Sequence, residues 1–151
     1  MTQVRPATVA DAPLLAALHA GGGGDRPWSA GEYQTFLARP QTLAWVAMTA
    51  DGPAGFLIAT LMADEAEIYE VVVAPAHRRR GLGQALMTAL ATQAKAAGAR
   101  KIHLEVAADN RAARALYEGC GYQAVGRRKG YYKYSNGDTA DAILMTLAIQ
   151  E

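Results

Sequence analysis

Arginine and glycine residues gather at one junction between a predicted strand and a predicted helix. Arg78, Arg79 and Arg80 are followed directly by Gly81-Leu82-Gly83. Glycines let backbone N–H groups approach a ligand closely, and the start of a helix adds unpaired N–H donors and a positive dipole. Arginine contributes fixed charge and fork-shaped donors. We therefore expect this junction to bind an anion such as a pyrophosphate; a helix start with solvated arginines is the alternative.

Two familiar nucleotide-binding motifs do not account for this junction. The dinucleotide fingerprint G-x-G-x-x-G needs glycine or alanine where Leu86 stands. A P-loop needs a Gly-Lys-Ser/Thr sequence, which the chain lacks. Both motifs therefore fail.

Several side chains along the chain could take part in acid–base chemistry. Glu105 and His103 share one face of a predicted half-polar strand. Glu70 interrupts an apolar run, and Glu67 stands at the start of that run. A buried carboxylate must be neutralised, paired or functional, which makes Glu70 the main alternative to Glu105 as a general base. On spacing alone, Tyr117 is an amphipathic tyrosine at the margin of the core.

Alternating strands and helices must position these residues. The apolar run over residues 68–73 predicts a central strand with both faces covered. Leucines and alanines at helical spacing predict a helix over residues 81–97, with Gly98 as its stop. Helices are also expected from Asp11, from Ser29 and over residues 110–118, and the four glycines at 21–24 should break the first of them. Other strands are expected over residues 3–6, 43–48, 56–61, 102–106, 122–125 and 142–147, the last two flanking a Gly- and Tyr-rich loop.

This pattern predicts an α/β (mixed α+β) fold, with a mixed central sheet of about seven strands and helices on both faces. The 151 residues form one predicted domain, and 51% of them are hydrophobic, enough for a real core. The net charge of +1 gives no global case for binding nucleic acid or an anionic membrane. The single cysteine, Cys120, is expected to pack in the core. The sequence has no possible internal disulfide, no export signal and no membrane span, so we expect a cytoplasmic protein. It has no zinc-binding pattern, so we expect no metal.

The Arg/Gly junction resembles the R/Q-x-x-G-x-G/A coenzyme A motif of the GNAT acetyltransferases. Further segments resemble the RimI-type protein N-terminal acetyltransferases of that family, and together they cover most of the chain from about His19. The four glycines are a departure from the family, where the link is shorter and less uniform. The matching segments are residues 27–29, 104–110, 115–118, 121–122, 126–132 and 141–142.

The resemblance implies a GNAT fold with acetyl-CoA as cosubstrate and no metal. In such enzymes the backbone of the central strand pairs with the pantetheine arm, and the loop and helix start after it hold the pyrophosphate. Asn110 would contact the same arm, and it shares a helix face with Tyr117 about two turns, roughly 10 Å, away. The implied cofactor-binding residues are Val71, Val72, Val73, Arg78, Arg79, Arg80, Gly81, Leu82, Gly83, Gln84 and Asn110.

The resemblance also implies roles in the reaction. Tyr117 would protonate the leaving thiolate and Glu105 would be the base, with Glu70 remaining the rival and Glu67 the position used by histone-type relatives. A backbone N–H near Val71 or Val72 is the expected oxyanion donor. The acceptor is expected to contact Trp28, Glu70, Tyr131 and Tyr132.

The implied activity is direct acetyl transfer to the N-terminal α-amine of a protein, with a ribosomal protein as the expected acceptor. An α-amine has a pKa of about 8 and a lysine about 10.4, so an N-terminus is roughly 3 kcal/mol easier to deprotonate. Two alternatives remain open: acetylation of a small amine such as an amino acid, polyamine or aminoglycoside, and a non-catalytic acyl-CoA-binding module. The sequence does not determine the oligomeric state.

Overall fold

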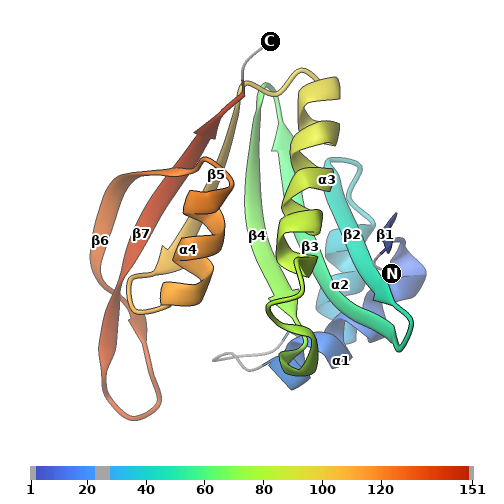
Figure 1. The fold of residues 1–151 in the computed structure, drawn as a ribbon, viewed down its shortest axis with the longest axis horizontal. Helices are drawn as coiled ribbons and strands as arrows, with labels where there is room; N and C mark the ends of the chain where they lie inside the picture. The colour runs from blue at the N-terminus through green and yellow to red at the C-terminus, as the bar shows by residue number, and fades with distance from the viewer. Residues whose placement is uncertain (1–2, 23–27, 150–151) are drawn as a thin grey trace.

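One sheet organises the part of the chain that the computed structural model describes, residues 3–22 and 28–149. Within these residues seven strands lie in the order β1-β2-β3-β4-β5-β7-β6 (Figure 1). Neighbours are antiparallel except β4 and β5, which are parallel, so the predicted mixed sheet of about seven strands is confirmed. The strands are β1 (Gln3–Pro6), β2 (Thr42–Thr49), β3 (Gly52–Met62), β4 (Glu65–Val73), β5 (Lys101–Ala107), β6 (Gln123–Lys133) and β7 (Thr139–Ala148).

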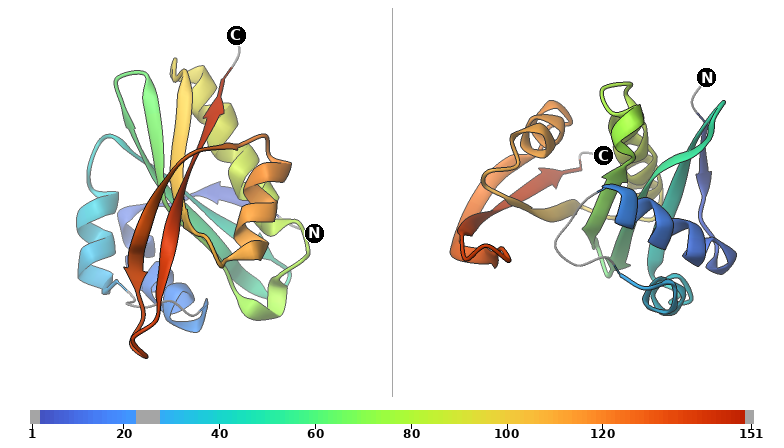
Figure 2. Two further views of the ribbon diagram at one scale, coloured as in Figure 1. Left: turned by 90° about the vertical axis from the view of Figure 1, so that its left-hand side faces the viewer. Right: turned by 90° about the horizontal axis from the view of Figure 1, so that it is seen from below.

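Helices cover both faces of the sheet, as predicted. Helices α1 (Ala12–Gly22) and α2 (Ala30–Leu37) lie on one face, and α3 (Leu82–Ala96) and α4 (Arg111–Gly119) lie on the other (Figure 2). Short 3-10 turns, Val9–Asp11 and Pro75–His77, precede α1 and α3. Each face has its own apolar core, because the side chains of a strand alternate between the two faces.

Helix α3 forms where the leucine periodicity predicts it. Leu86 and Leu90 are fully buried against the sheet, and Gly98 follows the helix with φ +87°. Gly83, in the first turn, has a specific packing role. A Cβ at this position would lie 2.9 Å from Cδ2 of Leu116 in α4. Glycine therefore allows the two helices to approach closely.

Strands β4 and β5 separate after a short stretch of pairing. Their parallel ladder joins only Glu65–Glu67 to residues 101–103. Beyond it, β4 keeps β3 as partner on its far side and β5 keeps β7, and Figure 1 shows the two strands diverging toward the start of α3. No described strand pairs with the edge of β4 that faces β5 over residues 68–73. No strand among the described residues therefore occupies the backbone N–H and C=O groups of that edge.

A β-bulge in β4 changes which face its side chains occupy. Ile58 and Ala59 of β3 are consecutive, but they oppose Glu70 and Ile68, so Tyr69 is the extra residue. As a result Tyr69 and Glu70 both point toward α1 and α2. Tyr69 lies with its ring 5.0 Å from that of Phe36. Without the bulge, alternation would place Glu70 in the core beneath α3, together with Ile68.

Several local expectations need correction. Residues 126–133 form part of β6 instead of a loop, because two register irregularities accommodate the glycines there.

Asp11 does not cap α1; it closes a 3-10 turn and binds Arg5 at 2.9 Å. Helix α1 continues to Gly22, and the rest of the glycine run lies outside the described residues. The predicted cover over β4 is incomplete, since Tyr69 is exposed. The Ser29 cap of α2 is confirmed.

Replacing Leu86 by alanine should lower the free energy of unfolding by about 2–5 kcal/mol, because it leaves a cavity under α3. Urea unfolding of the purified protein measures the change. The matched control is Thr88→Ala on the exposed side of the same helix, which should change stability by less than about 0.5 kcal/mol. Equal losses in the two variants would contradict the described packing of α3.

Candidate active site

The loop between β4 and α3 carries donors and positive charge. Arg79 and Gly81 have positive φ values of 65° and 80°, and Gly81 is the N-cap of α3. Because the first helical bond joins Ala85 N–H to the Gly81 carbonyl, the N–H groups of residues 82–84 have no intrahelical acceptor. The side chains of residues 78–80 are exposed, and Arg78 Nε donates to the Val73 carbonyl at 3.3 Å. This arrangement suits a diphosphate.

Tyr117 lies on the core side of α4. It is 8% exposed, and its ring lies 6.3 Å from that of Tyr122. Burial raises the pKa of Tyr117 to about 12, with smaller contributions from Tyr132 and Cys120. The hydroxyl therefore stays protonated around neutral pH and is able to donate its proton.

Glu105 lies on the separated part of β5, with its side chain on the opposite face from Leu104 and Val106. The side chain is 28% exposed, and its Oε1 lies 3.4 Å from Nη2 of Arg128 in β6. The carboxylate thus has one cationic neighbour and remains partly open to solvent.

Tyr132 on β6 is close enough to both Glu105 and Tyr117 to interact with them electrostatically. Its pKa is raised mainly by burial and secondly by the negative charge of Glu105, and its own charge contributes to the raised pKa of Tyr117. Three side chains from β5, β6 and α4 thus lie within electrostatic range of one another through Tyr132. Two of them were predicted as acid and base from the resemblance, and the third as an acceptor contact.

Tyr131 stands beside this group on the β6–β7 hairpin, which projects beyond the sheet in Figure 1. The residue is 51% exposed, and its ring lies 5.3 Å from the ring of Tyr132 at nearly a right angle, with the Arg128 guanidinium over it. The hairpin is held by Asp141, which accepts a hydrogen bond from Gly130 N–H at 2.9 Å. The tyrosine pair is therefore placed on a supported strand.

Asn110 caps α4. Its Oδ1 accepts a hydrogen bond from Ala113 N–H at 3.2 Å, which leaves the side-chain NH₂ as the group able to reach a ligand. The predicted helix start is therefore correct to one residue.

Glu70 is paired with two side chains that the sequence did not indicate. Tyr33 donates its hydroxyl proton to Glu70 Oε1 at 2.7 Å, and His19 Nδ1 lies 3.2 Å from Oε2. Burial raises the pKa of Glu70, and the Tyr33 hydrogen bond and His19 oppose this rise. These residues come from β4, α2 and α1, and nothing in their sequence spacing connects them. The expectation that a buried carboxylate needs a partner was the one available signal.

Trp28 belongs to the same side of the molecule as Glu70. Its ring packs 5.1 Å from Tyr33 and 5.6 Å from Phe36. Among the residues described, it makes no ring contact with Tyr131 or Tyr132, which lie on β6. The structure therefore does not bring the predicted aromatic contacts into one cluster.

The weaker base candidates lie where β4 and β5 are still paired. His103 binds the Glu65 carboxylate through Nε2 and lies 2.8 Å from Thr146 Oγ1 through Nδ1. Glu67 is exposed and opposite His103 in the ladder. Neither lies on the separated part of the two strands.

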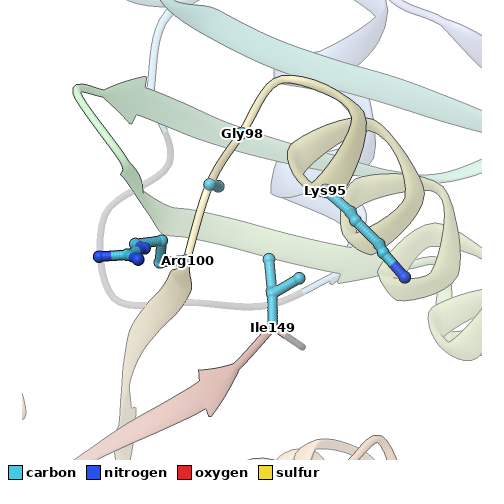
Figure 3. A pocket seen from close by; sticks show the side chains of 5 residues that line it. Lys95, Gly98, Arg100 and Ile149 are labelled. Atoms are coloured by element: carbon cyan, nitrogen blue, oxygen red, sulfur yellow. The ribbon is translucent and has the colours of Figure 1, made fainter. Parts of the chain in front are cut away.

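A pocket of about 200 Å³ lies at the far end of α3 from the arginine loop (Figure 3). It contains none of the candidate residues, so we do not associate it with the chemistry. Its lining residues are Lys95, Gly98, Ala99, Arg100 and Ile149.

Among the described residues, no helix combines the length and hydrophobicity that a membrane span requires. No group of three or more His, Cys, Asp or Glu side chains in this part of the chain is arranged to hold a metal ion.

Comparisons with known proteins identify similar enzymes and a similar fold. Two [ribosomal protein bS18]-alanine N-acetyltransferases are similar in sequence: that of Escherichia coli is 40% identical over 96 residues, 64% of each chain, and that of Salmonella typhimurium is 37% identical over 124 residues, 82% of each chain. The match thus spans slightly less than two thirds of the Escherichia coli relative. The crystal structure of the ribosomal-protein-S18-alanine N-acetyltransferase from Escherichia coli superposes with a TM-score of 0.91 at 30% identity, covering 100% of this chain and 96% of that chain.

A family-level match covers most of the site described above. Residues 14–122 match the acetyltransferase (GNAT) family, a family that uses acetyl-CoA. This range includes the open edge of β4, the arginine loop, Glu105 and Tyr117. The chain belongs to the GNAT family of acetyltransferases.

Proposed function

We propose that this protein acetylates the N-terminal α-amine of a protein from acetyl-CoA, with ribosomal protein bS18 as the candidate acceptor. The observation that carries the proposal is the unpaired edge of β4, which leads directly into the arginine loop and faces Glu105 on β5. The names of the similar enzymes support the choice of an α-amine.

The cosubstrate site fits an acyl-CoA molecule. An extended amide-containing arm can add to the open edge at Val71, Val72 and Val73 as a further strand would. The arginine side chains and the free N–H groups of residues 82–84 would bind its diphosphate, and the side-chain NH₂ of Asn110 would reach the arm. Acetyl-CoA supplies the acetyl thioester.

The reaction removes two protons from the acceptor ammonium group and delivers one to the leaving sulfur. Glu105 accepts the first proton, which leaves a neutral amine whose nitrogen attacks the acetyl carbon. The second proton leaves the nitrogen for solvent after the new bond has formed. A backbone N–H of Val71 or Val72 stabilises the oxyanion. As the carbon–sulfur bond breaks, Tyr117 gives its proton to the sulfur and regains one from solvent through the site. The amine and thioester react directly, without an acyl-enzyme.

An α-amine suits a carboxylate base. Its pKa of about 8 leaves a useful neutral fraction at physiological pH, whereas a lysine amine at about 10.4 is almost wholly charged. Tyr131 and Tyr132 would form one wall for the first residues of the acceptor, since tyrosine combines apolar area with a polar tip.

A peptide panel tests the activity. We expect the protein with acetyl-CoA to add one acetyl group, at the α-amine, to peptides that begin with alanine, located by tandem mass spectrometry. The same peptide with a blocked α-amine and an internal lysine is the control and should remain unmodified. Acetylation of polyamines, aminoglycosides or free amino acids in place of peptides would contradict the proposal.

Removing the charge of the arginine loop should weaken acetyl-CoA binding. The double variant Arg79→Ala/Arg80→Ala should lower the affinity about tenfold, measured by calorimetry, because charge-assisted contacts to the diphosphate are lost. The loss should shrink at high salt. The control is Lys95→Ala/Arg100→Ala, which removes two charges at the other end of α3 (Figure 3) and should leave the affinity unchanged.

Variants of the proposed acid and base should lose turnover while remaining folded. Glu105→Gln and Tyr117→Phe should each lower kcat about a hundredfold or more, since each removes one proton transfer. Steady-state assays with an alanine peptide measure the effect. Glu67→Gln on β4 and Tyr122→Phe beside Tyr117 are matched controls that should stay near the wild-type rate. Full activity in Glu105→Gln would show that another group is the base.

A further inference from the structure

The His19–Tyr33–Glu70 cluster is a set of buried polar side chains that the proposed mechanism does not use. Tyr33 is fully buried and His19 is 9% exposed. The Tyr33 hydroxyl lies 2.7 Å from both His19 Nδ1 and Glu70 Oε1. Three different elements, α1, α2 and β4, thus contribute to one hydrogen-bonded group.

The direction of these hydrogen bonds shows what the cluster stabilises. A tyrosine hydroxyl has one hydrogen, and Tyr33 gives it to Glu70. The contact between His19 and the Tyr33 oxygen must then be made by an Nδ1–H, which also faces Glu70 Oε2 at 3.2 Å. Both partners therefore present hydrogens to the cluster, and both favour an ionised Glu70 carboxylate.

Glu70 retains capacity for another donor. An ionised carboxylate offers about four acceptor positions, and Tyr33 and His19 use two of them. The side chain is 15% exposed, so it remains reachable from solvent. A partly buried anion that has been desolvated and aligned but not fully paired is suited to bind a cation.

The position of Glu70 in the fold points to which cation this is. The residue comes directly before the unpaired edge at Val71–Val73, where the thioester would lie. The bulge turns its side chain toward α1 and α2, on the sheet face away from α3 and α4. Glu105 occupies that same face on the neighbouring strand, since Leu104 and Val106 on either side of it enter the core beneath α3 and α4. Two carboxylates thus lie on one face of the sheet, on the two strands that diverge.

We propose that Glu70 binds the ammonium group of the acceptor, and that Tyr33 and His19 are positioning residues that hold its carboxylate. This rests on the proposed acetyltransferase function and divides the work between two carboxylates. Glu70 accepts a hydrogen bond from one N–H of the incoming ammonium group. Glu105 removes the proton that must leave before the nitrogen attacks. No group is oxidised or reduced.

These two roles predict that substitutions of Glu70 and Glu105 affect different kinetic constants, KM for Glu70 and kcat for Glu105. Glu70→Gln should raise the KM for an alanine peptide about tenfold or more with kcat within about threefold of wild type, because a charged hydrogen bond to the bound amine is lost. The KM for acetyl-CoA should not change. Tyr33→Phe keeps the ring that packs on Trp28 and Phe56, and should raise the peptide KM in the same direction by a smaller factor.

Glu67→Gln, on the same strand but outside the separated region, is the control and should leave both KM values unchanged. An unchanged peptide KM in Glu70→Gln overturns the proposal. A fall in kcat alone overturns it as well, and would make Glu70 the base. If Glu70→Gln does not fold, Tyr33→Phe decides by the same criterion.

Calorimetric titration with the alanine peptide separates this proposal from the proposed function. Wild-type protein should bind the free amine about tenfold more tightly than the same peptide lacking its α-amino group, and Glu70→Gln should abolish that preference. If wild type acetylates no peptide, the proposed function fails, and the same titration still tests whether Glu70 recognises the ammonium group. Equal binding of the two peptides to wild type overturns the inference.

Discussion

The hydrogen-bonded ladder between β4 and β5 ends early, and the position of the open strand edge depends on this. In a continuous sheet the backbone groups of a central strand are used up by its two neighbours. Here pairing stops at Glu67 and His103, and β4 continues with a partner on one side only. A central strand thereby acquires the properties of an edge strand inside the sheet. An extended ligand can complete it, and the arginine loop stands at the end of the same strand.

The two faces of the sheet contribute different chemistry around this opening. Helices α3 and α4 supply the loop, the helix start and Tyr117, whose proton is retained because the side chain is buried. The opposite face presents two carboxylates in different surroundings: Glu105 beside a guanidinium at 3.4 Å, and Glu70 beside a phenol and an imidazole. The bulge at Tyr69 is what places Glu70 on this face. One inserted residue thus separates a position in the core beneath α3 from a position beside α1 and α2.

Sequence periodicity predicted most of the fold because each strong pattern reflects one buried face. The leucines of α3, the Ser29 cap and the number of strands all follow from local rules. Local rules failed where pairing between strands determines the structure. Strand β6 extends through residues 126–133 because β7 pairs with it, and no residue propensity signals the bulge in β4. The roles of Glu105 and Tyr117 came from resemblance to a family. The partnership of His19 and Tyr33 with Glu70 depends on three distant segments meeting, which spacing along the chain does not reveal.

The contact between Gly83 and Leu116 makes the two helices of the site mechanically dependent on each other. The hydrogen atom that stands in place of a side chain at residue 83 lets the first turn of α3 rest on the residue directly before Tyr117. A bulkier residue there would push on the segment that carries the tyrosine hydroxyl. A displacement of the first turn of α3 would therefore also displace Leu116 beside Tyr117, so the arginine loop and this tyrosine are coupled through one contact.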